Sequence, residues 1–144
     1  DGTPECESAV RYAARRAELA EKKLIVIVAI DNQKETHWLG VERKIIEEAE
    51  ENTKILIEQL QKSISHFSKV NISYEVLNGS KITIVNQIIR DKPDISYLVI
   101  ASNNDKNSPG ELVEFISKSG FSIPVVVIPG DMSNDTIDKL VGIS

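Results

Sequence analysis

The stretch Leu24-Ile25-Val26-Ile27-Val28-Ala29-Ile30 decides the fold class of this chain. The run contains no polar residue, and most of its side chains are β-branched. Such runs are typical of parallel strands that are covered on both faces, because both sets of alternating side chains are then buried. The run is also far too short to span a bilayer. The sequence therefore predicts a buried strand in a parallel sheet.

Helical patterns lie on both sides of this strand. From Pro4 to Ala20 small apolar residues recur at three- and four-residue steps, with charged residues between them. This pattern predicts an amphipathic helix whose alanine-rich side packs close to a sheet. After the strand, a second and longer apolar stripe predicts a helix from about Val41 to Phe67, and it comprises Ile45, Ala49, Leu56, Leu60, Ile64 and Phe67.

Further strands and helices alternate through the rest of the chain. The expected strands are 71–77, 97–101 and 123–128, and the expected helices are 82–90, 110–118 and a terminal helix capped by Ser133 that runs to about Val141. Alternation of this kind indicates parallel βαβ units and hence an α/β fold with an open parallel sheet and helices on both faces. No internal repeat or linker divides the chain, so residues 1–144 are interpreted as a single domain.

Composition excludes several classes of partner. The chain has 144 residues, a net charge of −5 and a sequence pI of about 5.1. Nucleic acids and anionic membranes demand clustered Lys and Arg, so we expect neither as a partner. The single cysteine, Cys6, excludes an intramolecular disulfide and suits a reducing compartment, so we expect a cytoplasmic protein.

Several motifs, in this order, resemble the universal stress protein family. They are Asp1-Gly2-Thr3-Pro4-Glu5 followed by the alanine-rich segment 9–17, the strand 24–30, the turn Asn78-Gly79-Ser80, Lys92-Pro93-Asp94, and the closing strand 123–129. The resemblance covers nearly the whole chain. It implies a five-stranded parallel sheet in the order 3-2-1-4-5. The first and central strand of that order is expected upstream of Asp1, because Asp1 to Pro4 has the character of a turn entering a helix.

The resemblance also has implications for ATP binding. Many family members bind ATP through an aspartate in the first turn, which Asp1 matches, and through the loop pattern G-x-x-G-x9-G-[ST] after the fourth strand. In this chain Ala101 and Asn104 stand at the first two glycine positions, and Glu114 and Phe115 stand at the closing pair. A phosphate cradle needs close approach of backbone amides, and Glu114 would repel a triphosphate. We therefore expect no ATP binding in the family manner.

A variant phosphate loop remains the alternative, because Ser108-Pro109-Gly110 precedes a helix whose N-terminal amides can accept an anion. The chain would then be a nucleotide-binding switch or weak ATPase. Its candidate ligand-binding residues are Asp1, Thr3, Val28, Ala29, Ile30, Ala101, Ser102, Asn104, Ser108 and Gly110.

Other candidate sites have simpler explanations. His37 and Trp38 would either stack on a ligand or, as we favour, pack over the following helix. Cys6 is interpreted as a small helix residue and His66 as a helix-terminal one. The acidic cluster Glu47, Glu48, Glu50 and Glu51 lacks the alternating ligands of a calcium loop, which indicates a solvated helix face.

No catalytic motif or metal-ligand spacing is present in the sequence. A nucleotide-transfer enzyme of the wider α/β group is a distant third possibility, because its signature H-x-G-H is missing. We therefore predict a non-catalytic stress-response or signalling domain without a metal, which acts by binding and homodimerisation. The resemblance implies that dimers pair through the last strand, at Val125, Val126, Val127 and Ile128.

Overall fold

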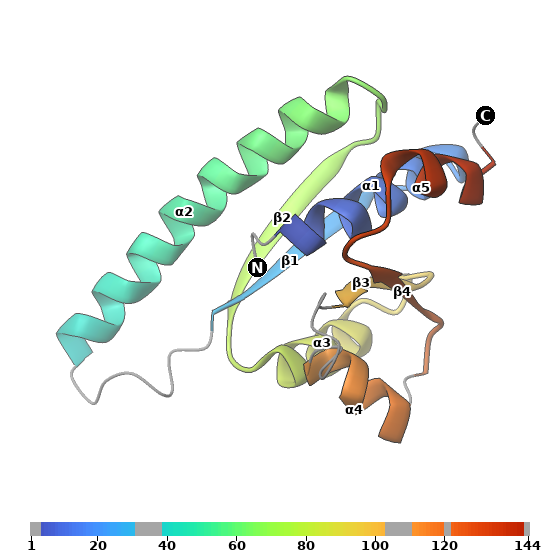
Figure 1. Cartoon of the computed structure of the whole chain (residues 1–144). Coiled ribbons are helices and arrows are strands. Elements are labelled where there is room, and N and C mark those ends of the chain that lie inside the picture. Colours follow the sequence, from blue (N-terminus) through green and yellow to red (C-terminus); the bar gives the residue numbers. More distant parts are fainter. Residues whose placement is uncertain (1–3, 31–38, 103–110, 120–121, 143–144) are drawn as a thin grey trace.

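Two pairs of parallel strands and five helices make up the described part of the computed structural model (Figure 1). The structure describes residues 4–30, 39–102, 111–119 and 122–142. In the first pair, β1 (Leu24–Ile30) lies beside β2 (Ile72–Asn78). In the second, β3 (Leu98–Ser102) lies beside β4 (Val125–Pro129). The predicted α/β class with parallel strands is confirmed.

The two strand pairs are not joined in one sheet within the described residues. β1 and β2 run in register from Leu24 opposite Ile72 to Ile30 opposite Asn78. β3 and β4 run in register from Leu98 opposite Val125 to Ser102 opposite Pro129. Among the described strands, β1 does not pair with β3, so a continuous five-stranded sheet is not observed.

The burial of β1 differs from the sequence prediction. An unbroken apolar strand was expected to be covered on both faces, yet its described side chains are only half-buried, and Ile25 is 38% exposed. The physical reason is that β1 has one hydrogen-bonded neighbour in the described sheets, β2, and so lies at an edge. The core lies elsewhere, around Ile84, Ile100, Ile128 and Ile137.

Helix α1 (Pro4–Leu19) connects the two strand pairs (Figure 1). It contacts β1, β3 and β4 and the last described helix, α5 (Asn134–Leu140). Its small side chains are nearly inaccessible: Ala14 is 0% exposed, and Ala9, Ala13 and Ala17 are also buried. Alanine has no bulk beyond Cβ, so the helix can approach the strands closely. The predicted alanine-rich packing face is confirmed.

Helix α2 (Leu39–Ser65) is long and lies along the first strand pair (Figure 1). Its buried residues in the described part are Thr53, Ile57 and Ile64, whereas Ile55 is 49% exposed. The predicted stripe included Ile64 but missed Ile57 and Thr53. The Thr53 hydroxyl donates to the carbonyl of Ala49 at 2.7 Å, which satisfies this buried polar side chain within its own helix.

The remaining helices of the described part are α3 (Lys81–Asp91), α4 (Glu111–Ser119) and α5. Of these, α3 and α5 each follow a serine N-cap. The Ser80 hydroxyl accepts from the amide of Thr83 at 3.2 Å, and the Ser133 hydroxyl accepts from the amide of Thr136 at 3.2 Å. Gly79 has a φ of 145°, a backbone conformation that side chains disfavour. The predicted turn at Asn78-Gly79-Ser80 and the predicted cap at Ser133 are both confirmed.

Candidate functional site

The predicted ligand site was expected at the carboxyl ends of β1 and β3. Val28 and Ala29 lie half-buried on β1, opposite Val76 and Leu77, and the backbone of Ile30 pairs with Asn78. Ala101 and Ser102 lie half-buried on β3, opposite Ile128 and Pro129. These two groups belong to separate strand pairs. The other predicted site residues lie outside the described residues: Asp1, Thr3, Asn104, Ser108 and Gly110.

The start of α1 adjoins the carboxyl end of β4. The buried Ser8 hydroxyl contacts the carbonyl oxygens of Gly130 at 3.3 Å and of Met132 at 3.2 Å. Both carbonyls follow β4 directly in the chain. Ligands of open α/β sheets bind near the carboxyl ends of strands and near helix N-termini. This contact joins α1 to the segment after β4, which the sequence did not assign to the ligand site.

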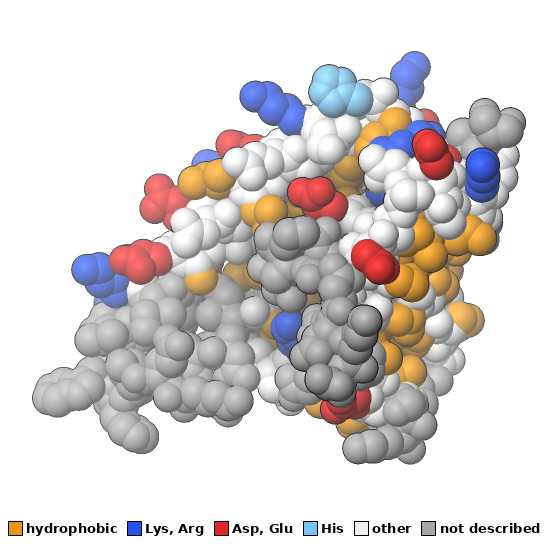
Figure 2. All heavy atoms as spheres, viewed as in Figure 1, with side chains coloured by type: hydrophobic (Ala, Val, Ile, Leu, Met, Phe, Trp, Pro, Cys, Tyr) orange, Lys and Arg blue, Asp and Glu red, His pale blue; other side chains and the backbone are white. Residues whose placement is uncertain are grey.

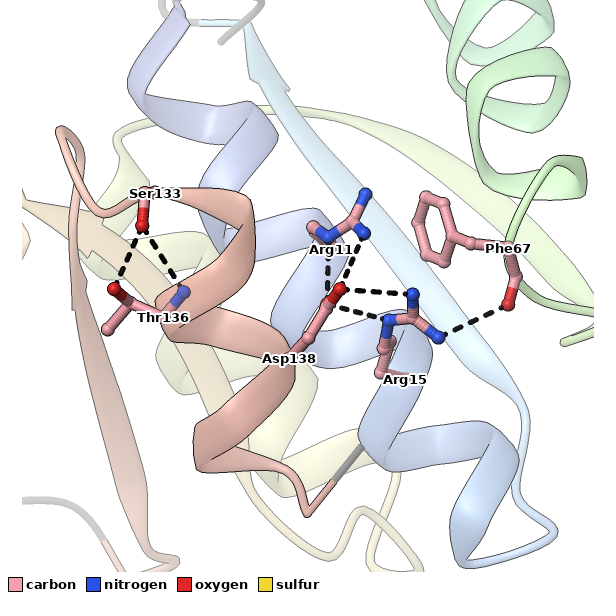
Figure 3. A network of polar contacts seen from close by, with 6 residues as sticks. All are labelled: Arg11, Arg15, Phe67, Ser133, Thr136 and Asp138. Atoms are coloured by element: carbon pink, nitrogen blue, oxygen red, sulfur yellow. Dashed lines mark hydrogen bonds and ion pairs between the residues drawn. The ribbon is translucent and has the colours of Figure 1, made fainter. Parts of the chain in front are cut away.

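The most extensive polar site in the described part is a cluster that the sequence did not predict (Figure 3). It consists of Arg11, Arg15, Phe67 and Asp138, and we call it the Arg–Asp–Phe cluster. Arg11 donates to Asp138 in a bidentate arrangement, from Nε to Oδ1 at 3.0 Å and from Nη2 to Oδ2 at 2.8 Å. Arg15 donates to the same carboxylate from Nε at 2.8 Å and from Nη2 at 3.3 Å.

Phe67 completes the Arg–Asp–Phe cluster from the segment after α2 (Figure 3). The guanidinium carbons of Arg11 and Arg15 lie 4.3 and 4.7 Å from the centre of its ring. Arg15 also donates from Nη1 to the Phe67 carbonyl at 3.4 Å. Cation–π contact and hydrogen bonding therefore act on the same residue, and the cluster joins α1, α5 and the chain between α2 and β2.

The electrostatics of this cluster favour the ionised carboxylate. The hydrogen bond from Arg11 is the main factor that lowers the pKa of Asp138, and the contact with Arg15 lowers it further. The Arg15 side chain is 11% exposed and the Asp138 side chain 19%, so water reaches the pair only in part. A carboxylate held ionised by two guanidinium groups is a poor proton acceptor near neutral pH. The carboxylate joins α1 to α5 through both arginines.

Two smaller polar contacts link neighbouring elements. The Glu18 carboxylate accepts from the amide of Lys69 at 3.1 Å, and this hydrogen bond is the main reason that the pKa of Glu18 is lowered. Lys92 forms an ion pair with Glu75 at 2.8 Å, and the hydrogen bond in that pair raises the pKa of Lys92. The first contact links α1 to the segment before β2, and the second links the C-terminal end of α3 to the middle of β2.

Two open grooves in the described part lie beside β2. Neither is lined by a residue of the predicted ligand site. The larger, about 590 Å³, is lined by Glu47, Glu50, Glu51, Lys54, Tyr74 and Val76. The smaller, about 340 Å³, lies where α2 ends and β2 begins, with Ile64, Ser68 and Ile72 among its lining residues. The four glutamates of the acidic cluster, Glu47, Glu48, Glu50 and Glu51, are all exposed, as the sequence predicted. Within the described ranges, no group of His, Cys, Asp and Glu is arranged to hold a metal ion.

The remaining candidates occupy ordinary positions where they are described. Cys6 is half-buried in α1, and His66 is exposed just after α2. His37 and Trp38 lie outside the described residues. No helix that the structure describes is both long enough and apolar enough to cross a membrane.

Only the pairing of the two arginines in the Arg–Asp–Phe cluster is visible in the sequence. Arg11 and Arg15 are four residues apart, which places them on one side of a helix. Their partner Asp138 lies 127 positions beyond Arg11, and no local pattern connects the two.

Comparison of the chain with family models, with curated proteins and with solved structures finds no match.

Proposed function

We propose that this chain is a cytoplasmic, non-catalytic stress-response or signalling domain that acts by binding and by forming a homodimer through β4. The observation that carries the proposal is the outer edge of β4. β4 pairs with β3 on one side, and no described strand pairs with its other side. Its residues Val125 to Ile128 carry no charge, and Val127 is 38% exposed. A β-branched edge strand without charges invites pairing with another chain.

The sheet order is part of the proposal. Among the described strands, β1 and β3 each have one edge that pairs with no other strand. Helix α1 contacts both strand pairs. A further parallel strand between β1 and β3 would complete a five-stranded sheet in the order 3-2-1-4-5. We propose that residues upstream of Asp1 supply this strand. It would also cover the half-exposed side chains of β1.

Three described ionisable groups take part in contacts that join elements of the fold. The groups whose pKa is shifted are Glu18, Lys92 and Asp138, and each is engaged in a hydrogen bond or ion pair that stabilises its charged form.

Sedimentation velocity tests the homodimer. Wild-type protein should sediment as a dimer, whereas Val127→Lys should sediment as a monomer, because a charged side chain on an edge strand opposes pairing with another chain. Ile55→Lys is the matched control, since Ile55 is an exposed isoleucine on α2, and it should leave the dimer intact. A wild-type protein that stays monomeric up to millimolar concentration would contradict the proposal.

A nucleotide-binding switch or weak ATPase is the second candidate. Its described candidate residues, Val28 to Ile30 and Ala101 to Ser102, lie at the carboxyl ends of β1 and β3, the ends at which open α/β sheets bind ligands. Calorimetry with ATP, ADP and AMP in the presence of magnesium separates the two candidates. Heat of binding at a stoichiometry of one would favour the switch, and no heat at millimolar nucleotide would eliminate it.

A further inference from the structure

The side of β2 that faces away from β1 pairs with no other described strand, and we call it the outer edge of β2. β2 pairs with β1 along its whole length, from Ile72 to Asn78, without a bulge. Lysine and proline, which commonly protect a free edge, do not occur in β2. Its charged side chain, Glu75, is already engaged by Lys92. Among the described strands, β2 therefore has an edge to which a further strand can be added.

The ladder to β1 determines which main-chain groups β2 presents at its outer edge. The amide of Leu24 donates to the carbonyl of Asn71 at 3.1 Å, and Leu24 lies opposite Ile72 in the register. Successive residues of a strand direct their main-chain groups to opposite sides. Asn71 directs its carbonyl toward β1, and the odd-numbered residues of β2 do the same. The remaining residues direct an N–H and a carbonyl to the outer edge, and these are Ile72, Tyr74, Val76 and Asn78.

The groove of about 590 Å³ lies beside this edge. Two of its lining residues, Tyr74 and Val76, are residues whose main-chain groups point outward. The Tyr74 side chain is 40% exposed, and Val76 is half-buried. The other wall belongs to α2, where the lining residues recur at three- and four-residue steps and so share one side of the helix: Glu47, Glu50, Glu51 and Lys54. Strand donors and acceptors, an aromatic ring and carboxylates therefore border one groove.

We propose that this groove binds an extended basic peptide, which adds to the outer edge of β2 as a further strand. Main-chain hydrogen bonds to β2 supply affinity, as in other cases of strand addition. Peptide side chains opposite Tyr74 and Val76 point to the same face as those two residues, which is the face of the groove and of α2. Arginine or lysine at alternate peptide positions then reaches the carboxylates of α2, and arginine also stacks on the Tyr74 ring.

The charges of the groove decide between the possible occupants. Its lining holds three carboxylates and one ammonium group, and the whole chain has a net charge of −5. A second copy of this chain would bring the same carboxylates to the same edge, and like charges oppose pairing. A basic peptide is attracted instead. Figure 2 shows charged side chains along the surface where Figure 1 places α2.

A synthetic peptide tests the proposal. The probe is Thr-Arg-Val-Arg-Val-Arg-Thr with fluorescein at its N-terminus and an amidated C-terminus, and fluorescence anisotropy measures its binding to the wild-type protein. Two peptides are controls. In one, glutamate replaces each arginine. In the other, the three central residues are N-methylated, so they cannot donate to a ladder in either strand direction. Both controls should bind roughly tenfold more weakly, or less.

Variants of α2 test the groove without altering the strand. Glu47→Gln with Glu51→Gln should weaken binding about fivefold, because two exposed charge pairs are lost. Glu48→Gln with Glu58→Gln is the matched control, since both residues are exposed on the same helix outside the groove, and it should leave binding unchanged. Lys54→Gln should strengthen binding about twofold, because it removes a cation from the lining.

Amide hydrogen exchange, followed by NMR residue by residue, locates the bound peptide. The peptide should slow exchange at the outward amides of Tyr74 and Val76. The amides of Ser73 and Glu75 point toward β1 in the ladder, so they serve as internal controls. This measurement uses the wild-type protein and therefore does not depend on the folding of any variant.

The contrary outcomes are specific. Equal binding of the N-methylated peptide would show that charge attraction alone holds the probe, and strand addition would be wrong. Equal weakening by both glutamine pairs, or unchanged exchange at Tyr74 and Val76, would place the probe elsewhere. Absence of binding at about 1 mM peptide would remove the site.

The result is separable from the homodimer proposed above, which uses β4. A homodimer that dissociates when the peptide binds would show that β2 is the edge used for self-association, and would overturn the peptide site. A wild-type protein that is monomeric and still binds the probe at β2 would contradict the homodimer alone.

Discussion

Arg11 and Asp138 form a bidentate ion pair between the first and last helices of the chain, with Nη2 2.8 Å from Oδ2. Planar guanidinium and carboxylate groups fit each other in this geometry, so both groups are held in one orientation. Arg15 contacts the same carboxylate, and Phe67 lies against both guanidinium groups. The free energy of unfolding should therefore depend on Asp138 more than on other acidic residues of the surface.

Asp138→Asn should lower the free energy of unfolding by about 1–2 kcal/mol, because Arg11 and Arg15 would face each other without a counter-charge. The expected loss is small because the pair is partly exposed and water screens its charges. Urea denaturation measures the change. Asp131→Asn is the matched control, since Asp131 is exposed and should shift the midpoint very little. Equal effects of both substitutions would show that the cluster does not stabilise the fold.

Acid should destabilise the wild-type protein more than Asp138→Asn. The pKa of Asp138 is lower in the folded state than the ordinary value of 3.8, so the folded state binds this proton less readily than the unfolded state. The stabilisation is present above pH 3.8 and is lost as the pH falls through the lowered folded-state pKa. Urea midpoints of the two proteins should therefore converge between neutral pH and strong acid. A difference in urea midpoint that stays the same at every pH would show that ionised Asp138 is not the source of the stabilisation.

Ser133→Ala should destabilise the protein by about 1 kcal/mol, because the first turn of α5 loses the acceptor for the amide of Thr136. α5 contributes Ile137, which is 0% exposed, and Asp138 of the cluster, so the loss should reach the global transition. Ser133→Asp retains a capping oxygen and should recover most of the loss. Thermal unfolding of the wild type, Ser133→Ala and Ser133→Asp measures these differences. If the two variants were equally destabilised, the effect would come from loss of the serine hydroxyl itself and not from loss of the helix cap.

Ala14→Leu should destabilise the protein by about 1–3 kcal/mol or more, because Ala14 is 0% exposed in a helix that contacts both strand pairs. The larger side chain has no space unless α1 moves away from the strands. Ala20→Leu introduces the same side chain at an exposed position just after α1 and should be nearly neutral. A neutral effect at Ala14 would mean that the α1 packing face is looser than the structure shows.

Local sequence patterns were sufficient for most of the secondary structure. β1 runs from Leu24 to Ile30, as its apolar run predicts, and α5 begins after the predicted cap at Ser133. The Gly79 turn lies where the sequence placed it. The buried line of α2 was predicted less well, since Ile57 and Thr53 were missed. A long helix offers several apolar residues, and only the packing partner selects which of them are buried.

The sequence by itself determined the elements of this protein, because helix periodicity, β-branched runs, caps and turns depend on residues a few positions apart. Only the tertiary structure decided that the described strands form two separate pairs and that Arg11 reaches Asp138 across 127 positions. Such pairings depend on where the chain returns in space, and many distant partners fit a given local pattern equally well. The exposure of Ile25 on β1 follows from the same cause, since a strand is covered only when its neighbours are present.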